Sequence, residues 1–453
     1  MANTLSIGNA QAFWGDRNEA ALQLILEAPH LQYITFDYLA EISMSILAMQ
    51  REKDPSKGYA QDFIEVVKSL IPYWEAGGEV KLISNAGGLN PKACAEACAK
   101  VLQNSSCRPF KIAYVVGDNV IELLQQNSDA PYCNHLDTKE PLAAIADRLV
   151  SANAYLGGRA IANALATGAN IIITGRVADP SLTVGACLHH FQWQDNEYDK
   201  IAGATVAGHL IECGTQVTGG IATNWLEQPQ NGALGYPIVE VNEDGSFVIT
   251  KPAGTGGEVS IRTVKEQLLY EIGDPGKYLS PDATVSFLSL ELAQEGTNRV
   301  AVKGAKGSAP PLSYKVSASY KDGYKAEGFL AFFGLQAAKK AERAGEIIFE
   351  RLKEQGKLPE RYISEVFGTG AIVPGIGKVN SESVECLLRV AAADPREIIL
   401  EAFSKELAPL VTSGPAGTTG YTSGRPRIRQ IFAYWPCLVP TDLLFTSVHT
   451  IEV

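Results

Sequence analysis

The chain has 453 residues, of which 46% are hydrophobic and 20% are charged, and its formal net charge is −11. This length accommodates two or three domains, and the composition supplies a substantial core and argues against a disordered chain. The acidic balance argues against a nucleic-acid-binding surface, which requires a basic patch. It does not exclude an anionic substrate, because a few local groups can override the global field.

Cysteine usage and hydropathy indicate the compartment. The eight cysteines include no Cys-x-x-Cys pair, and no apolar run reaches the roughly 18 residues that a membrane span requires. The first residues also lack the charged and then apolar pattern of a secretory signal. We therefore expect a cytoplasmic protein with reduced thiols and no membrane or nucleic-acid partner. The large apolar content and the acidic surface also favour a homo-oligomer.

The first half of the chain alternates between two patterns. Strand-like runs occur at residues 5–8, 32–36, 80–84, 111–117 and 170–174. Helical patterns occur at residues 18–26, 38–50, 61–74, 91–102, 120–126 and 141–166. This alternation predicts an α/β fold with a doubly wound, mostly parallel sheet that helices cover on both faces, and five or six strands are too few for a closed barrel. We assign residues 1–235 to an α/β ligand-binding domain.

The pattern changes near residue 235. Hairpin signals follow at Glu243–Asp244–Gly245 and at Lys321–Asp322–Gly323. Further strand-like runs occur at residues 283–292, 299–302, 428–435 and 443–453, and helical patterns at residues 335–354 and 395–407. Strands segregated from helices predict a second, α+β domain over residues 236–453 with an antiparallel sheet, and we place the junction near residues 250–260.

Three glycine-bearing loops lie between an apolar run and a helix start, at residues 6–20, 82–94 and 172–184. Asp16, Asn90 and Asp179 are candidate helix caps, and a proline follows the last two at the first helical position. Such loops direct unpaired helix N–H groups toward one edge of a sheet, where α/β proteins bind anionic ligands. The sequence therefore predicts an anion-binding site at this edge.

Each of these loops has a functional and a structural interpretation. Arg17 is either an anion clamp or a solvated side chain beside the Asp16 cap. Arg176 can bind a carboxylate or phosphate through a bidentate pair of hydrogen bonds. Asp179 is a general base, a metal ligand or only a helix cap. The second loop brings backbone close to a ligand or is a turn required for packing. Its candidate binding residues are Asn85, Gly87, Gly88 and Asn90.

Carboxylates and a histidine provide candidates for proton transfer. Asp37 lies at the carboxyl end of a strand, and Glu41 follows four residues later. In the functional interpretation, the two carboxylates transfer protons or bind a divalent cation. In the structural interpretation, one is a helix cap and the other is a solvated side chain. His209 and Cys213 share a helix face, and we rank His209 higher because the helix dipole does not stabilise a thiolate near a helix C-terminus. His209 and Glu212 alone are too few ligands to specify a metal.

Several further glycine-rich segments accompany these candidates. Gly214 is predicted to follow the C-terminus of the helix that carries His209, and Gly219 and Gly220 form a flexible turn beside it. Residues 254–260 are a candidate hinge. The long loop at residues 413–427 ends in arginines that include Arg425. It either surrounds and binds a phosphate or pyrophosphate group, or it is a mobile surface loop.

Five motifs together resemble one family, the acyclic terpene utilisation protein A (AtuA-like) family, also described as a domain of unknown function. They are WGDR (14–17), SNAGGLNP (84–91), ITGRVADPSLTVG (173–185), HLIECGTQVTGG (209–220) and GTGGEVS (254–260), and the resemblance covers nearly the whole chain. It implies a part in the breakdown of branched terpenoids such as citronellol and geraniol through coenzyme A thioesters. Longer members carry a further small C-terminal domain, which implies a separate small partner for this chain. The resemblance supplies no catalytic residues.

The residues and the resemblance lead to one primary hypothesis. We expect an enzyme, a hydratase or lyase, that acts on a small organic acid or an acyl-CoA, with coenzyme A as part of the substrate. Arg176 and the N–H groups of the second loop would hold the anionic end, His209, Asp37 or Glu41 would move the proton, and a divalent metal ion is a candidate cofactor. The alternative is a non-catalytic binding or scaffold subunit of an acyl-CoA-processing complex. A nucleotide-dependent redox enzyme is disfavoured because the Gly-x-Gly-x-x-Gly fingerprint is absent.

Overall fold

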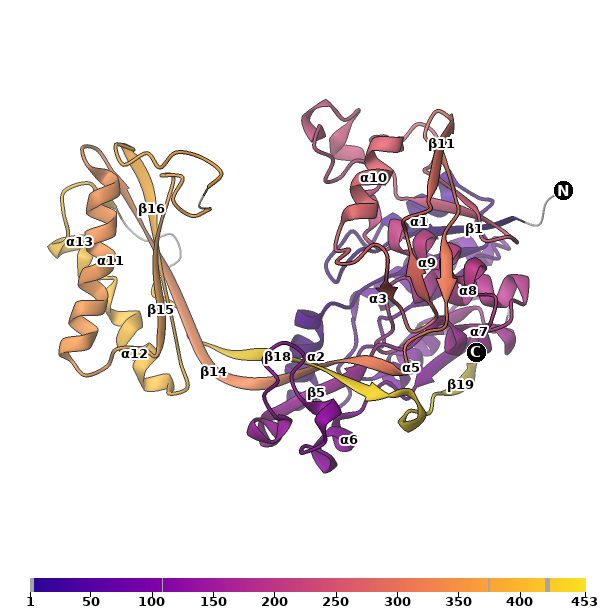
Figure 1. Ribbon diagram of the computed structural model, residues 1–453, viewed down its shortest axis with the longest axis horizontal. Helices are drawn as coiled ribbons and strands as arrows, with labels where there is room; N and C mark the ends of the chain where they lie inside the picture. The colour runs from indigo at the N-terminus through magenta and orange to yellow at the C-terminus, as the bar shows by residue number, and fades with distance from the viewer. Residues whose placement is uncertain (1–3, 108, 374, 420–423) are drawn as a thin grey trace. The chain divides into compact units, whose positions relative to one another are not determined.

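The computed structural model describes residues 4–107, 109–373, 375–419 and 424–453 (Figure 1). The chain forms two compact units, Met1–Ser319 with Tyr434–Val453, and Tyr320–Ala433. Within the described residues, no helix combines the length and the apolar composition that crossing a membrane requires.

A ten-stranded sheet forms the centre of the first unit, in the order β11-β12-β8-β7-β1-β2-β3-β6-β4-β19. Its middle five strands are parallel and confirm the strands predicted in the first half of the chain. They are β1 (Thr4–Asn9), β2 (Tyr33–Phe36), β3 (Lys81–Ser84), β6 (Ile171–Ile173) and β4 (Lys111–Val116). The flanking strands are antiparallel: β7 (Ile238–Asn242), β8 (Phe247–Thr250), β12 (Arg299–Lys303) and β11 (Glu291–Gly296) beyond β1, and β19 (Ser447–Glu452) beyond β4.

The sheet is therefore mixed, and the prediction of a doubly wound, mostly parallel sheet is confirmed only in that five neighbouring strands are parallel. The other four of these strands all lie on one side of β1, in the order β1-β2-β3-β6-β4, and the strands on its other side are antiparallel, so the parallel strands do not wind in both directions from β1. The hairpin predicted at Asp244–Gly245 joins β7 to β8, and Gly245 has the positive φ of 85° that such a turn needs. Because β7 and β8 belong to this sheet, the predicted junction near residues 250–260 does not coincide with the division into units.

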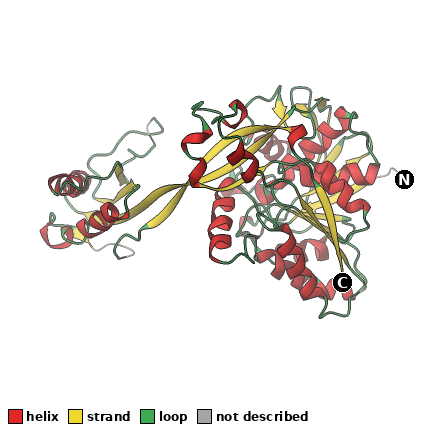
Figure 2. Ribbon diagram, turned by 90° about the horizontal axis from the view of Figure 1, so that it is seen from below, coloured by secondary structure: helices red, strands yellow, loops and turns green. Residues whose placement is uncertain are grey.

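Helices flank the sheet of the first unit (Figure 2). They are α1 (Ala20–Glu27), α2 (Glu41–Lys53), α3 (Asp62–Ser69), α4 (Ile71–Glu75), α5 (Pro91–Leu102), α6 (Ile121–Gln126), α7 (Gly158–Ala166), α8 (Ser181–Phe191), α9 (Tyr198–Glu212) and α10 (Ile261–Leu269). Ile34, Leu82 and Ile171 from three neighbouring strands form one core with the apolar faces of α1, α3 and α5. Helices α7, α8 and α9 contact strands of the same sheet, α7 at β4 and β6, α8 at β1 and β2, and α9 at β1 and β7. They contribute no described residue to that core, so they cover the opposite face.

The single helix predicted at residues 141–166 is wrong. A strand, β5 (Leu149–Ala154), pairs there with β14, and α7 begins only at Gly158. An apolar and alanine-rich run is compatible with a buried strand as well as a helix, and the partner strand lies far away in the sequence, so local periodicity could not decide. Three short strands, β9 (Tyr278–Leu279), β10 (Thr284–Ser286) and β13 (Lys306–Ser308), form a separate antiparallel sheet.

The second unit contains an antiparallel sheet with helices on one face. Its strands are β15 (Arg361–Phe367), β16 (Glu385–Asp394), β17 (Thr418–Thr419) and the part of β14 (Ser313–Phe333) from residue 320 onward, and β18 (Arg429–Pro440) also pairs with β14. The first residues of β14 and the last residues of β18 belong to the first unit. Its helices are α11 (Ala337–Glu354), α12 (Glu397–Glu406) and α13 (Leu410–Ser413). Leu330, Leu388 and Val390 of the sheet form a core with apolar residues of α11 and α12.

The hairpin predicted at Lys321–Asp322–Gly323 is wrong, because β14 runs through these residues without turning. Gly323 has a φ of 83°, and a Cβ atom at this position would lie 2.7 Å from the Cα of Pro395. The glycine thus permits close approach of the chain that follows β16 rather than a reversal of direction.

Candidate functional site

A cavity of about 850 Å³ in the first unit collects polar side chains from segments far apart in the sequence. Asp37 and Glu41 come from the segment after β2, Arg176 and Asp179 from the segment after β6, and Glu212 from the end of α9. The carboxyl ends of adjacent parallel strands meet at one edge of a sheet, which explains why β2 and β6 deliver their polar residues to the same place. Cys213 and an apolar wall that includes Leu39 complete this part of the lining.

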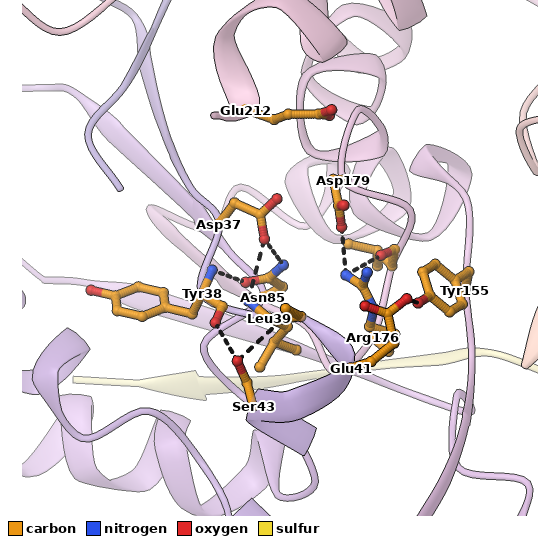
Figure 3. A network of polar contacts seen from close by, with 12 residues as sticks. Asp37, Tyr38, Leu39, Glu41, Ser43, Asn85, Tyr155, Arg176, Asp179 and Glu212 are labelled. Atoms are coloured by element: carbon orange, nitrogen blue, oxygen red, sulfur yellow. Dashed lines mark hydrogen bonds and ion pairs between the residues drawn. The ribbon is translucent and has the colours of Figure 1, made fainter. Parts of the chain in front are cut away.

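Asp37 is buried and is held by Asn85 (Figure 3). The amide nitrogen of Asn85 donates to Asp37 Oδ1 over 2.6 Å, while Asn85 Oδ1 accepts from the backbone N–H of Tyr38 over 2.7 Å. Burial raises the pKa of Asp37 well above its ordinary value, and the nearby carboxylate of Asp179 adds to this, against the opposing effects of Arg176 and Asn85. Burial therefore favours the protonated form of Asp37.

Arg176 is a buried cation at the cavity wall, with 2% of its surface exposed. Its Nη1 donates to Asp179 Oδ1 over 2.5 Å and to the carbonyl of Val177 over 2.9 Å, and its guanidinium lies 4.1 Å from the ring centre of Tyr155 (Figure 3). The Nε atom has no hydrogen-bond partner within the described residues. A buried donor without a hydrogen-bond partner is energetically costly.

Asp118 fixes the backbone at Arg176. Its Oδ2 accepts from the backbone N–H of Arg176 over 2.8 Å and from the side-chain amide of Asn153 over 2.7 Å. Burial raises the pKa of Asp118 to about 6, although these hydrogen bonds lower it. Asp118 thus orients the loop after β6 from outside the cavity.

Glu41 lies in the opposite electrostatic environment to Asp37. The hydroxyl of Tyr155 donates to Glu41 Oε1 over 2.6 Å, and Lys315 Nζ lies 3.6 Å from the same oxygen. Burial raises the pKa of Glu41, but the Tyr155 hydrogen bond, the local backbone and the nearby cations together outweigh it, and the pKa is lowered. One cavity therefore holds a carboxyl whose pKa is raised, Asp37, and another whose pKa is lowered, Glu41.

Glu212 and His209 form a buried pair behind the cavity surface. His209 Nδ1 lies 3.0 Å from Glu212 Oε1, and His209 Nε2 lies 3.0 Å from the carbonyl oxygen of Gln267. Glu212 lines the cavity and its Oε2 has no partner within the described residues, whereas His209 does not line the cavity. Burial raises the pKa of Glu212 to about 7 against the opposing effect of His209. The pKa of His209 is raised because its bond to Glu212 outweighs burial, which lowers it.

Cys213 is the residue after α9, and the structure disfavours it as a nucleophile. Burial raises the pKa of its thiol, and the charges of Glu212 and Asp37 raise it further. Gly214 follows with a φ of 56°, which confirms its predicted place just past the helix end.

The second glycine loop contributes to the cavity only through Asn85. Its N–H groups are used within the fold: those of Gly88, Leu89 and Asn90 donate to the carbonyls of Asn85, Gly58 and Gly87, respectively. A Cβ atom at Gly87 would lie 2.5 Å from the carbonyl oxygen of Thr174, so this glycine allows two strand ends to pack together. The backbone amides of the second loop, which were expected to bind an anion, do not line the cavity. All four predicted binding residues of this loop lie outside the lining, and Asn85 acts only through its hydrogen bond to Asp37; the other three are Gly87, Gly88 and Asn90.

The predicted caps differ in outcome. Asn90 caps α5 by accepting from the N–H of Ala93, as predicted. The Asp16 cap is wrong, because α1 begins at Ala20 and Asp16 instead accepts from the hydroxyl of Tyr236 over 2.8 Å. The Asp179 cap is also wrong, because its carboxylate turns to Arg176.

The remaining candidates do not reach the cavity lining. Arg17 is exposed and pairs with Glu19 over 3.0 Å. Gly219 packs beside Gln228, and Gly220 donates to the carbonyl of Thr215. Arg425 lies in the second unit, and residues 420–423 of its predicted loop lie outside the described residues. Within the described residues, no three His, Cys, Asp or Glu side chains gather in a group that could hold a metal ion.

Sequence reasoning did not place Tyr155, Lys315 or Asp118 in the site, and it named Glu212 only as a partner of His209. Tyr155 follows β5, which was predicted as helix, so no signal pointed to it. The spacing of three residues between His209 and Glu212 was a usable signal, because it places both side chains on one helix face.

A sheet with a parallel centre and a cavity lined by carboxyls whose pKa values are shifted in opposite directions defines an α/β protein with an internal polar cavity at its strand ends. The model of the family described as acyclic terpene utilisation family protein AtuA matches residues 5–450, and the chain belongs to this family. Membership confirms the family resemblance of the five motifs and suggests a role in acyclic terpene utilisation. No curated protein and no solved structure matches the chain.

Proposed function

We propose that this protein is a hydratase or lyase that acts on a carboxylic acid or its coenzyme A thioester in acyclic terpene utilisation. The observation that carries the proposal is Glu212, a buried cavity-lining carboxyl whose pKa is raised to about 7 and whose Oε2 is free of partners within the described residues. A group that titrates near neutral pH and faces a cavity is suited to general acid–base work.

His209 gives Glu212 a route for its proton. The carbonyl of Gln267 cannot donate, so His209 Nε2 carries a hydrogen and the neutral ring directs the lone pair of Nδ1 at Glu212 Oε1. When the ring takes the proton from Oε1, Glu212 becomes a carboxylate beside an imidazolium, and Oε2 can accept a proton from the substrate. His209 is thus a positioning residue that acts through Glu212.

Elimination of water needs a base for the proton on carbon and an acid for the departing oxygen. In our proposal Glu212 takes the carbon-bound proton while the C–O bond breaks, and Asp37, whose burial favours the protonated form, donates to the departing hydroxyl, which leaves as water. Hydration is the same sequence in reverse, with Asp37 taking a proton from water and Glu212 supplying one to carbon. The raised pKa of Asp37 and the positive charge of Arg176 at the cavity wall both favour binding of an anionic or carbonyl oxygen.

The test is solvent exchange, since reversible proton transfer at carbon incorporates deuterium from heavy water. The protein is incubated in heavy water with 3-hydroxyacyl-CoA and 2-enoyl-CoA thioesters and with the free acids, and the substrate carbons are followed by NMR. We expect incorporation with the wild type, a loss of 100-fold or more in Glu212→Gln, and no loss in Glu122→Gln, an exposed control on α6. Binding of these compounds without incorporation would support the alternative of a non-catalytic subunit, and absence of binding would overturn both.

A further inference from the structure

A second hollow, of about 280 Å³, lies in the second unit and is lined mainly by cations. Its lining consists of Lys325, Ala326, Glu327, Phe329, Arg425, Arg427 and Arg429. Residues 320–433 carry 16 Lys and Arg against 14 Asp and Glu, whereas the whole chain has 39 against 50. The cationic side chains that line the hollow therefore lie in the second unit, which carries a net positive charge although the protein as a whole is acidic.

Alternation along two extended segments explains how the arginines come together. Pro426 is buried, lying near the Cα of Gly328, and Ile428 packs against the core shared with α11 and α12. Side chains of an extended chain alternate between faces, so Arg425, Arg427 and Arg429 point away from that core. Lys325 and Phe329 do the same on β14, where their neighbours Ala326 and Leu330 belong to the core.

These residues thus lie on the face of the sheet that the described helices of this unit leave uncovered. In Figure 1, α11 and α12 lie together on one side of the sheet that contains β15 and β16. A concave site on an open sheet face is accessible to a ligand.

The cations of the hollow lack the carboxylate partners that other arginines of this unit have. Arg343, Arg361 and Arg396 each pair with an acidic residue. Within the described residues, Lys325 and the three hollow arginines make no such pair, and the one acidic residue of the lining, Glu327, is already paired with Arg389 over 3.1 Å. Like charges held close together are destabilising, so this arrangement favours an added anion.

The number of charges and the size of the hollow narrow the class of anion. A phosphate group brings up to two charges and several acceptor oxygens that match the fork of an arginine, whereas a carboxylate brings one. The volume is just below the roughly 300–1,000 Å³ of drug-sized ligand pockets, so it suits a compact group. The ring of Phe329 offers an apolar face beside the charges.

We propose that the hollow formed by Lys325, Phe329, Arg425, Arg427 and Arg429 is a binding site for a phosphorylated small molecule that carries at least two phosphate charges. The site is separate from the cavity that holds Glu212, and the proposal does not depend on the chemistry assigned to that cavity. Free diphosphate and the diphosphate portion of a nucleotide share this chemistry.

Calorimetric titration of the full chain tests the proposal, with inorganic pyrophosphate, ADP, citrate and a glutamate-rich peptide as separate ligands. We expect one site for pyrophosphate, binding of ADP at least as tight if the ring of Phe329 contacts the base, and citrate at least tenfold weaker. Arg427→Gln and Lys325→Gln should each weaken pyrophosphate binding about tenfold, because each removes one contacting cation. Lys339→Gln, which removes an exposed cation of α11 outside the hollow, should change nothing.

Three results would overturn the inference: no binding of pyrophosphate or ADP, equal binding by the Arg427→Gln, Lys325→Gln and Lys339→Gln variants, or tighter binding of the acidic peptide than of either phosphate compound. The substituted side chains are exposed, so the variants should fold, and matching thermal unfolding curves check this. Phe329→Leu separates the two phosphate sources, since it should weaken ADP binding but leave pyrophosphate binding unchanged.

Discussion

His209 Nδ1 and Glu212 Oε1 lie 3.0 Å apart in a pocket where both side chains are at least nine-tenths buried. The second ring nitrogen of His209 faces the carbonyl of Gln267, which fixes the tautomer of the neutral ring. The two groups therefore share one proton between them, and the remaining oxygen of Glu212 has no hydrogen-bond partner within the described residues. This relationship makes the site responsive to pH in the neutral range.

The first prediction concerns stability against pH. The pKa of Glu212 is raised from 4.5 to about 7 in the folded protein, so between these values the folded state holds a proton that the unfolded chain releases. The free energy of unfolding must then decrease as pH rises from about 4.5 to about 7, by an amount on the order of 3 kcal/mol for a shift of this size. Urea unfolding at several pH values measures the slope.

Glu212→Gln isolates this contribution. The variant lacks the carboxyl, and His209 loses the partner that raises its pKa, so the decrease with pH should become shallower by the same order. Asp37, Asp118 and Asp282 also have raised pKa values and contribute a decrease of the same sign in both proteins. An equal slope in the wild type and the variant would show that Glu212 titrates normally.

The second prediction concerns the buried cation. Arg176→Met removes the partner of Asp179, the stacking on Tyr155 and the hydrogen bond to Val177, and it leaves the carboxyls of the cavity without their nearest positive charge. We expect a loss of about 3 kcal/mol in the free energy of unfolding, measured by urea denaturation. Arg159→Met is the matched control, because Arg159 pairs with Asp195 at the surface and should cost about 1 kcal/mol or less. Equal losses would contradict the assignment of Arg176 as a buried, structurally required charge.

The parallel centre of the first unit was predictable because short apolar runs alternate with helical patterns and capping residues, as at Asn90 and α5. The two errors at residues 141–166 and 321–323 both lie on strands whose pairing partners are distant in the sequence. Strand β5 pairs with β14, and the part of β14 from Tyr324 onward pairs with β16. Such pairing can override local turn and helix preferences, and a single sequence gives no sign of it.

The site was predictable only in part. Asp37, Arg176 and Asp179 were found because polar residues at the carboxyl ends of parallel strands share one sheet edge. The position of His209 behind Glu212 was not predictable, because it depends on the approach of Gln267 from α10. Whether a glycine faces a ligand or a packed backbone also depends on tertiary contacts, as at Gly87 and Thr174.

The third prediction tests this reading of Gly87. In Gly87→Ala the new methyl group meets the backbone carbonyl of Thr174 and the Cα of Pro91, neither of which can rotate away. We expect a loss of about 1–3 kcal/mol in unfolding free energy. Gly273→Ala, at an exposed glycine with open space around it, should be neutral or slightly stabilising. If Gly87→Ala instead weakened ligand binding with stability unchanged, the glycine would be a binding residue and not a packing one.

The last prediction concerns thiol reactivity. Cys107 and Cys213 are the two cysteines that are not fully buried, and all eight are free. The thiolate is the reactive form, and burial together with the neighbouring acidic groups raises the pKa of Cys213. Iodoacetamide at about pH 8 should therefore modify Cys107 at least tenfold faster than Cys213, as followed by peptide mass spectrometry. In urea the two rates should become equal, since the chain environment is lost. Glu212→Gln removes one of the charges that raise the pKa of Cys213, so this variant should speed the modification of Cys213 in the folded protein. If Cys213 were modified faster than Cys107 in the wild type, Cys213 would again be a candidate nucleophile.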